Sequence, residues 1–129
     1  MAQFAAFIFV TPEYNYGMPG STKNAVDYLY NEITTKPAMI VSYGVQGGKN
    51  ASESLKVTLE GMKLRVVKVR PALPFHGGPG PDLFDAAGKG ELGEDSRKDW
   101  EEDKKKDVLD GVAELEQLMN EEVVSKKGE

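Results

Sequence analysis

Three short apolar segments alternate along the chain with two stretches whose apolar residues recur at helical spacing. The first segment, residues 4–10 (FAAFIFV), shows no alternation of apolar and polar residues, which is typical of a strand covered on both faces. A second apolar segment spans 38–42. The third, 64–69, alternates with charged residues and is typical of an edge strand with one face in water. The pattern therefore predicts three strands.

The stretches between these segments predict two amphipathic helices. Ser21 is a suitable N-terminal cap for a helix that runs to about Tyr30. Asn50 is a suitable cap for the second helix, with Glu53 at the reciprocal capping position and Gly61 as a stop. Strand, helix, strand, helix, strand is the element order of an open parallel sheet with right-handed crossovers, so the fold class expected is α/β.

The last third of the chain changes character twice. Residues 71–95 are rich in proline and glycine without a sustained period, and we expect them to form a long loop. Helical spacing returns over 96–126, where Gly111 weakens the helix by roughly 1 kcal/mol relative to alanine. The apolar stripe of this helix consists of Val108, Val112, Leu115, Met119 and Val123. We expect residues 1–129 to form a single partial domain.

Composition excludes several classes of function. With 129 residues, a net charge of −5 and a pI near 5.0, the chain is not suited to general binding of nucleic acid or of an acidic membrane. It has no cysteine and one histidine, so thiolate chemistry and a multi-histidine metal site are excluded, and a reducing cytoplasm is the expected location. The apolar start lacks the basic residues of a secretion signal, and no segment is long enough for a membrane span.

Two loops that follow the first and second predicted strands combine glycine with polar and aromatic residues. They read TPEYNYGMPG (11–20) and YGVQGGK (43–49). The carboxyl ends of parallel strands meet at one edge of the sheet, where ligands bind in open α/β folds. Glycine lets the backbone approach a ligand closely, so the pair suits a planar polar ligand. The alternative is a plain strand-to-helix turn, since these residue types are also common in turns.

The order TPEYNYGMPGSTKNAVDYLY followed by KPAMIVSYGVQGG resembles the NADPH-dependent FMN reductase family, a flavodoxin-like group that includes quinone and azo-dye reductases. The resemblance spans about residues 4–70. It implies a three-layer α/β/α fold, bound FMN, NADPH as co-substrate, and hydride transfer to a quinone, a flavin or another small acceptor. Because the cofactor carries this chemistry, we assign no catalytic side chain and no metal ligand.

The resemblance also implies which residues hold the isoalloxazine ring of FMN. The pyrimidine edge of the ring alternates hydrogen-bond donors and acceptors, which backbone groups of a glycine-bearing loop can match. The implied ring-binding residues are Pro12, Glu13, Tyr14, Asn15, Tyr16 and Gly17 of the first loop and Ser42, Tyr43, Gly44 and Gly47 of the second. Of the remaining candidates, we expect His76 to be a solvated loop residue and Trp100 to be a packing anchor.

The family pattern normally begins with a strand and a glycine- and serine-rich loop that holds the FMN phosphate at a helix N-terminus. The sequence contains no such loop, and HGGPGP (76–81) is a poor substitute because its prolines have no N–H to donate. In the sheet order 2-1-3-4-5, the absent strand would lie beside residues 4–10. We therefore expect an N-terminally truncated domain whose first strand has an unpaired edge.

Two accounts of this truncation lead to different functions. In the first, the chain is a clipped reductase whose activity is doubtful without the phosphate-binding loop. In the second, it is a short form that completes its sheet as a homodimer or with a partner. The alternative function is thus a non-catalytic remnant that acts as a dimerisation or interaction module, and a third is the binding of some other planar ligand.

Overall fold

The computed structural model describes the backbone of residues 4–128 and the side chains of residues 4–121. Its sheet is parallel, with β2 (Pro37–Gly44) in the centre and β1 (Phe7–Pro12) on one side. β3 (Arg65–Val66) and β4 (Ala72–Pro74) both pair with the other side of β2, one after the other. The described residues therefore form a four-stranded sheet, in which β1 and β2 correspond to the first two predicted strands and the third predicted strand is reduced to β3.

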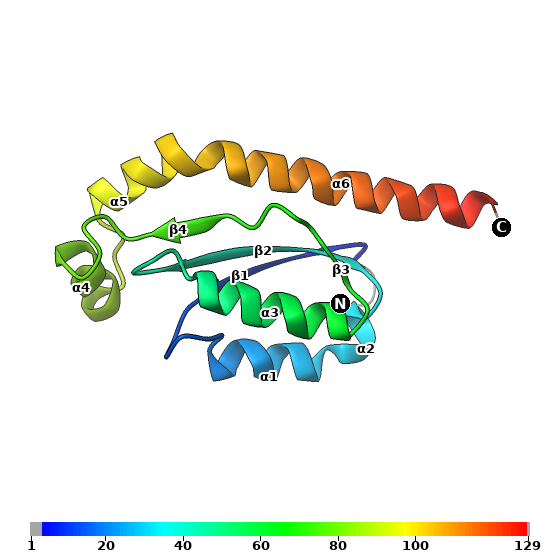
Figure 1. The fold of residues 1–129 in the computed structure, drawn as a ribbon, viewed down its shortest axis with the longest axis horizontal. Helices are drawn as coiled ribbons and strands as arrows, with labels where there is room; N and C mark the ends of the chain where they lie inside the picture. The colour runs from blue at the N-terminus through cyan, green and yellow to red at the C-terminus, as the bar shows by residue number, and fades with distance from the viewer. Residues whose placement is uncertain (1–3, 129) are drawn as a thin grey trace.

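Helices cover both faces of this sheet (Figure 1). α1 (Gly20–Tyr28), α2 (Tyr30–Ile33) and α3 (Lys49–Gly61) lie on one face. α5 (Glu94–Asp99), the π-helical turn η1 (Trp100–Lys104) and α6 (Lys105–Gly128) follow one another across the opposite face. The α/β class with a parallel sheet between helices is confirmed, and no helix among the described residues is long and apolar enough to cross a membrane.

The prediction of a long loop over 71–95 is wrong in two places. β4 continues the sheet within it, and residues Pro81–Lys89 form helix α4 beyond the carboxyl ends of the strands (Figure 1). The third predicted strand is likewise interrupted, because from Val66 to Ala72 the chain advances six residues while β2 advances four. In this break the Glu114 carboxylate of α6 accepts the N–H of Lys68 at 2.7 Å. The carboxylate thus gives this backbone N–H the hydrogen-bond acceptor that a neighbouring strand would otherwise provide.

The hydrophobic core has two layers, one on each face of β2. Ala38 and Ile40 face α1 and α3, whereas Met39 and Val41 face α6, as the alternation of side chains along a strand requires. Gly111 lies at the point where α6 crosses β2, and a Cβ there would stand 2.5 Å from Met39 Cε. Gly111 therefore permits close helix-to-sheet packing, which its effect on helix propensity alone does not reveal.

The predicted stripe of the last helix is only partly buried. Leu115 is buried and Val108 packs against the same cluster, while Val112 is 39% exposed. Met119 is half-buried, and the side chain of Val123 lies outside the described residues.

The predicted caps of the first two helices are wrong. α1 begins at Gly20 after Pro19, and α3 begins at Lys49 after Gly48, so neither Ser21 nor Asn50 caps its helix. Glu53 does not reach back to the helix start, because its carboxylate pairs with Arg70 at 3.0 Å.

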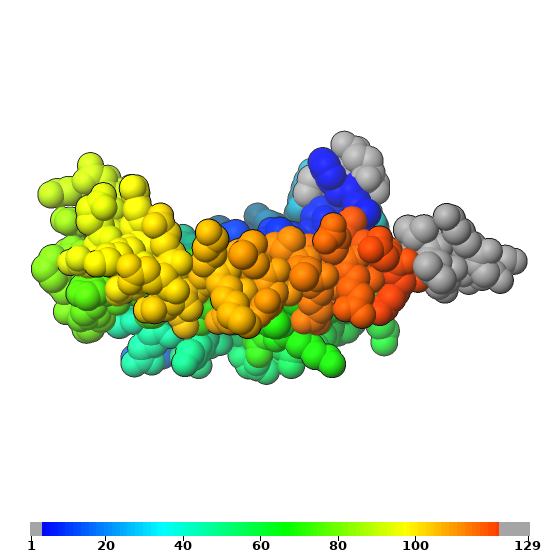
Figure 2. All heavy atoms as spheres, turned by 90° about the horizontal axis from the view of Figure 1, so that it is seen from above, coloured from blue at the N-terminus to red at the C-terminus, as the bar shows by residue number. Residues whose placement is uncertain are grey.

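β1 has an unpaired outer edge, since β2 is its only partner among the described strands. Its α6-side face is also uncovered: Ile8 is 52% exposed and Val10 is 64% exposed. Figure 2 looks onto the α6 side and shows the N-terminal residues, in blue, open beside that helix. The expected edge is confirmed, whereas the expectation of a strand covered on both faces is wrong for this face.

Candidate functional site

The first predicted loop forms a tight hairpin directly after β1. Tyr14 and Gly17 exchange backbone hydrogen bonds of 3.0 and 3.2 Å, and the two residues between them, Asn15 and Tyr16, have φ values of 51° and 66°. Positive φ at both central positions defines a type I′ turn. The turn leaves the rings of Tyr14 and Tyr16 largely exposed at the carboxyl end of the sheet.

The second predicted loop folds back on itself after β2. The buried Ser42 hydroxyl donates to the carbonyl of Gly47 at 2.7 Å. Gly48 has φ 73°, and a Cβ there would lie 2.7 Å from the Tyr43 carbonyl oxygen, so only glycine fits this position without distortion. The fold of the loop leaves Val45 and Gln46 exposed at its tip.

A carboxylate joins the two loops. Glu13 Oε1 accepts the backbone N–H groups of Asn50 at 2.8 Å and of Ala51 at 3.0 Å, in the first turn of α3. These are helix N-terminal amides without an intrahelical acceptor, and a carboxylate there also interacts favourably with the helix dipole. Glu13 therefore caps α3 from the first loop and links the loop after β1 to the helix that follows the second loop.

Two adjoining hollows lie between the loops, and Glu13 and Val45 border both. The first has a volume of about 230 Å³. Its lining consists of Pro12, Glu13, Tyr14, Tyr43, Gly44, Val45, Phe75, Leu83, Ala86 and Ala87. The second, of about 370 Å³, is lined by Glu13, Asn15, Tyr16, Val45 and Gln46. The loops that the sequence placed at one edge of the sheet thus share one recessed region.

Seven of the ten predicted site residues line these hollows. The other three, Gly17, Ser42 and Gly47, shape the loops from behind: Gly17 closes the turn, and Ser42 and Gly47 are buried. Sequence reasoning missed the third wall, which Phe75 and α4 supply. Pro81 at the first helical position, a Leu83, Ala86, Ala87 spacing and a stop at Gly90 were the available signals for α4.

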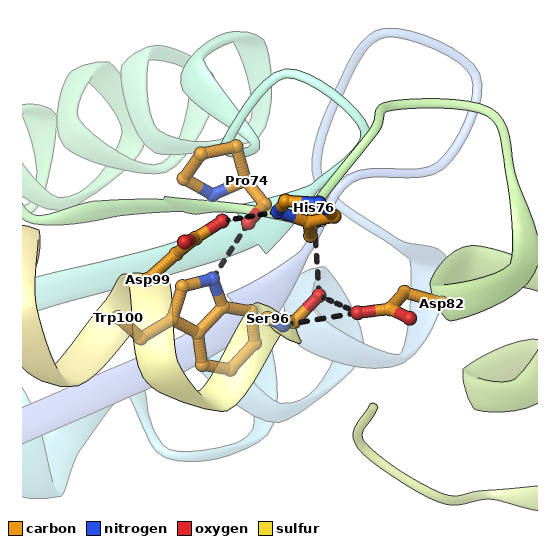
Figure 3. A network of polar contacts seen from close by, with 6 residues as sticks. All are labelled: Pro74, His76, Asp82, Ser96, Asp99 and Trp100. Carbon is orange, nitrogen blue, oxygen red and sulfur yellow. Dashed lines mark hydrogen bonds and ion pairs between the residues drawn. The ribbon is translucent and has the colours of Figure 1, made fainter. Parts of the chain in front are cut away.

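A polar network fastens α4 to α5 (Figure 3). Asp82 Oδ2 accepts the Ser96 N–H at 2.9 Å and the Ser96 hydroxyl at 2.6 Å, and this hydroxyl accepts the N–H of His76 at 2.9 Å. His76 Nδ1 lies 2.7 Å from Asp99 Oδ2. The hydrogen bond from the Ser96 hydroxyl lowers the pKa of Asp82, and the hydrogen bond with Asp99 raises the pKa of His76.

Two residues in and beside this network, His76 and Trp100, lie as expected. His76 is an exposed loop residue. Trp100 packs against Phe75 with a ring-centroid distance of 6.0 Å, and its Nε1–H donates to the Pro74 carbonyl at 2.6 Å. The packing role predicted for Trp100 is confirmed.

Comparison with known proteins decides the family. The model of the family NADPH-dependent FMN reductase matches residues 1–77. The chain belongs to this family. The NAD(P)H-dependent FMN reductase ntnL of Nectria sp is 48% identical over 121 residues, which cover 92% of this chain and 59% of that protein. The NAD(P)H-dependent FMN reductase LOT6 of Saccharomyces cerevisiae is 48% identical over 60 residues, or 46% of this chain and 31% of that protein.

A solved structure supports the flavodoxin-like fold. The flavoenzyme FerB, an NAD(P)H:(acceptor) oxidoreductase from Paracoccus denitrificans, matches with a TM-score of 0.62 at 20% identity, over 93% of this chain and 63% of that one. At this identity the likeness shows the fold alone. The chain spans 59% of the length of ntnL and 31% of that of LOT6.

The residues around the hollows fit the ring of the family's cofactor, whereas the helix that starts beside them, α3, does not fit its phosphate. The N–H groups of Asn15, Tyr16 and Gln46 donate to no other group among the described residues, and all three residues line the second hollow, which suits a ring edge that carries hydrogen-bond acceptors. A phosphate needs consecutive amides at a helix N-terminus. In α3, the helix that starts at this site, the Glu13 carboxylate already occupies those amides.

Proposed function

We propose that this chain carries the ring-binding part of an FMN-dependent reductase that passes hydride from NADPH or NADH to a quinone, a flavin or a similar small acceptor. The observation that supports this most directly is the shared recess between the two strand-end loops, which Glu13 ties together. Family membership supports the same function. ntnL and LOT6 are named NAD(P)H-dependent FMN reductases, and a protein of Pseudomonas putida that is 34% identical over 91 residues is named a quinone reductase.

The roles of the side chains follow from where they lie. Pro12, Tyr14, Asn15, Tyr43 and Gly44 would contact the ring, because they line the hollows. Gly17, Ser42 and Gly47 would keep the loops in shape. FMN, when bound, would supply the hydride transfer, so the protein has to position the ring and exclude water from it.

FMN titration tests this proposal. We expect the quenching of FMN fluorescence to give a micromolar or lower dissociation constant, and we expect the chain to oxidise NADPH in the presence of naphthoquinone. A chain that quenches no FMN fluorescence at high micromolar concentration would contradict it. Tyr16→Ala, at a ring 85% exposed beside the hollow, should weaken binding more than Tyr28→Ala, which is equally exposed on α1 away from the site.

The uncovered edge of β1 favours a second function, self-association into a homodimer. Its outer backbone groups have no partner among the described strands, and Ile8 and Val10 are exposed beside them. Val10→Lys should then shift the chain towards the monomer in light scattering, whereas Val57→Lys, at a similarly exposed valine on α3, should not. A wild-type monomer at high concentration would contradict this function. We also propose a cytoplasmic location, which the absence of cysteine supports.

A further inference from the structure

The smaller hollow has three walls, of which one differs in chemistry from the other two. The hairpin after β1 and the loop after β2 supply two walls with backbone polar groups and tyrosine rings. The third wall is α4, whose Leu83, Ala86 and Ala87 recur at helical spacing and present one aliphatic face to the hollow. Phe84, which is 68% exposed, is not part of this lining.

The lining of this hollow contains a single charged group, the carboxylate of Glu13. Its Oε1 is already engaged with two amides of α3, and no arginine, lysine or histidine lines the hollow. An anionic ligand would therefore enter without a compensating cation and close to a carboxylate, which is unfavourable in a partly desolvated site. A flat, uncharged ring with carbonyl groups meets neither penalty.

The position of α4 depends on a contact at its first turn. Asp82 accepts two hydrogen bonds from Ser96, whose side chain is fully buried. The fit is close, since a Cβ on Gly93 would overlap the Asp82 carboxylate at 2.4 Å. The helix is thus docked by its N-terminal turn, while its two alanines leave space at the hollow (Figure 3 shows the Asp82–Ser96 contact).

We infer that α4 is the specificity-determining wall of this hollow and that Asp82 and Ser96 are the positioning residues that hold it in place. Ala86 and Ala87 leave room on the α4 side for an uncharged planar quinone, while the two loops on the opposite side contact the ring of FMN. This inference rests on the proposed reductase function for its biological meaning. The recess itself is a property of the chain and can be tested with or without FMN. Bulk at Ala87 should exclude the ligand, and loss of the Ser96 hydroxyl should displace the wall.

The test uses naphthoquinone and its sulfonate as probes on the purified chain. Trp100 is the only tryptophan and packs against Phe75 of the lining, so its fluorescence reports occupation of the hollow. We expect Ala87→Leu to weaken naphthoquinone binding at least roughly tenfold, because a few methylene groups in an apolar pocket change affinity by that factor or more. The matched control is Ala113→Leu, at an exposed alanine of α6, and it should leave binding unchanged. The sulfonate should bind wild type at least roughly tenfold more weakly than naphthoquinone.

Ser96→Ala separates positioning from general damage. If the wall alone is displaced, the KM for naphthoquinone should rise while FMN affinity and kcat remain near those of wild type. Where FMN does not bind, the same variant is compared by tryptophan quenching. Equal binding of naphthoquinone by Ala87→Leu and Ala113→Leu, or no binding by wild type, would overturn the inference.

The FMN titration judges the proposed function separately. If wild type binds FMN but Ala87→Leu binds naphthoquinone as wild type does, the inference is rejected and the proposed function is kept. If Ala87→Leu abolishes naphthoquinone binding but wild type binds no FMN, the inference is kept and the proposed function is rejected.

Discussion

β1 and β2 are adjacent parallel strands of similar apolar character, yet β2 is far more buried than β1. Ile40 and Met39 of β2 are 0% exposed, whereas Ile8 of β1, which is paired with Met39, is 52% exposed. β2 has a strand on each side and a helix layer on each face. β1 has a strand on one side, and α6 crosses the sheet over β2 and leaves β1 open (Figure 2).

The difference shows what an apolar pattern can and cannot predict. A run without alternation predicts that both faces of a strand carry apolar side chains, and β1 does carry them on both faces. Whether these side chains are buried depends on what packs against them, and that is a property of other segments. In β2 the pattern and the packing agree, whereas in β1 they do not, so variants in the two strands should differ in their effect on stability.

The largest difference is expected between the two isoleucines. Ile40→Ala should lower the free energy of unfolding by about 2–5 kcal/mol, because it leaves a cavity in the core between the sheet and α3. Ile8→Ala should cost less than about 1 kcal/mol, because its side chain is already half in water. Urea denaturation of both variants measures this. Equal losses would show that Ile8 is covered in solution, and dilution would then reveal whether a second copy covers it.

The contact between α6 and β2 should respond next. Gly111→Ala gains helix propensity but places a Cβ against the buried Met39, so it should cost about 1–3 kcal/mol in the free energy of unfolding. In a Met39→Ala background the obstructing atoms are gone, and the same substitution should become neutral or stabilising. A double-mutant cycle from denaturation curves measures the coupling. Additive effects would mean that α6 does not approach β2 this closely.

Local sequence patterns were sufficient for the first two strands, the two crossover helices and the position of the site. The first two strands lie where their apolar residues predicted, within a few residues at each end, and the helix predicted over 96–126 corresponds to α5, η1 and α6 taken together. The interrupted third strand and α4 could not be placed in the same way. The carboxylate of Glu114 stabilises the break between β3 and β4, and it comes from a helix 45 residues or more further along the chain.

The caps and the site show the same limit. Ser21 and Asn50 are favourable capping residues by type, but α3 takes its cap from Glu13, 37 residues before Asn50. The sequence brought Glu13 to the correct edge of the sheet without showing that its carboxylate faces the helix. The proline- and glycine-rich composition of 71–95 also concealed the short helix whose aliphatic face forms the third wall of the hollow.

A smaller effect is expected at the link between the ends of β1 and β2. Glu13→Ala removes the cap of α3 and should cost about 1 kcal/mol in the free energy of unfolding. Glu13→Gln keeps an oxygen acceptor and should cost less. Hydrogen exchange of the Asn50 and Ala51 amides gives the local readout, with faster exchange expected in the alanine variant. Unchanged exchange in Glu13→Ala would show that the two strand ends are not joined in this way.

The smallest effect is expected from pH, in the network that holds α4. The hydrogen bond with Asp99, then its charge, raises the pKa of His76 above the ordinary 6.5, so the pair stabilises the fold fully below that pH. This contribution is lost as the pH rises from 6.5 through the folded-state pKa. The effect should be slight, because the two side chains are 51% and 41% exposed. The measurement is the denaturation midpoint at a pH below this window and at a pH above it. The difference between the two midpoints should be larger for wild type than for Asp99→Asn. Asp103→Asn, at an exposed residue nearby in the sequence, is the control and should show the wild-type difference. The same pH sensitivity in Asp99→Asn would assign the effect to another group.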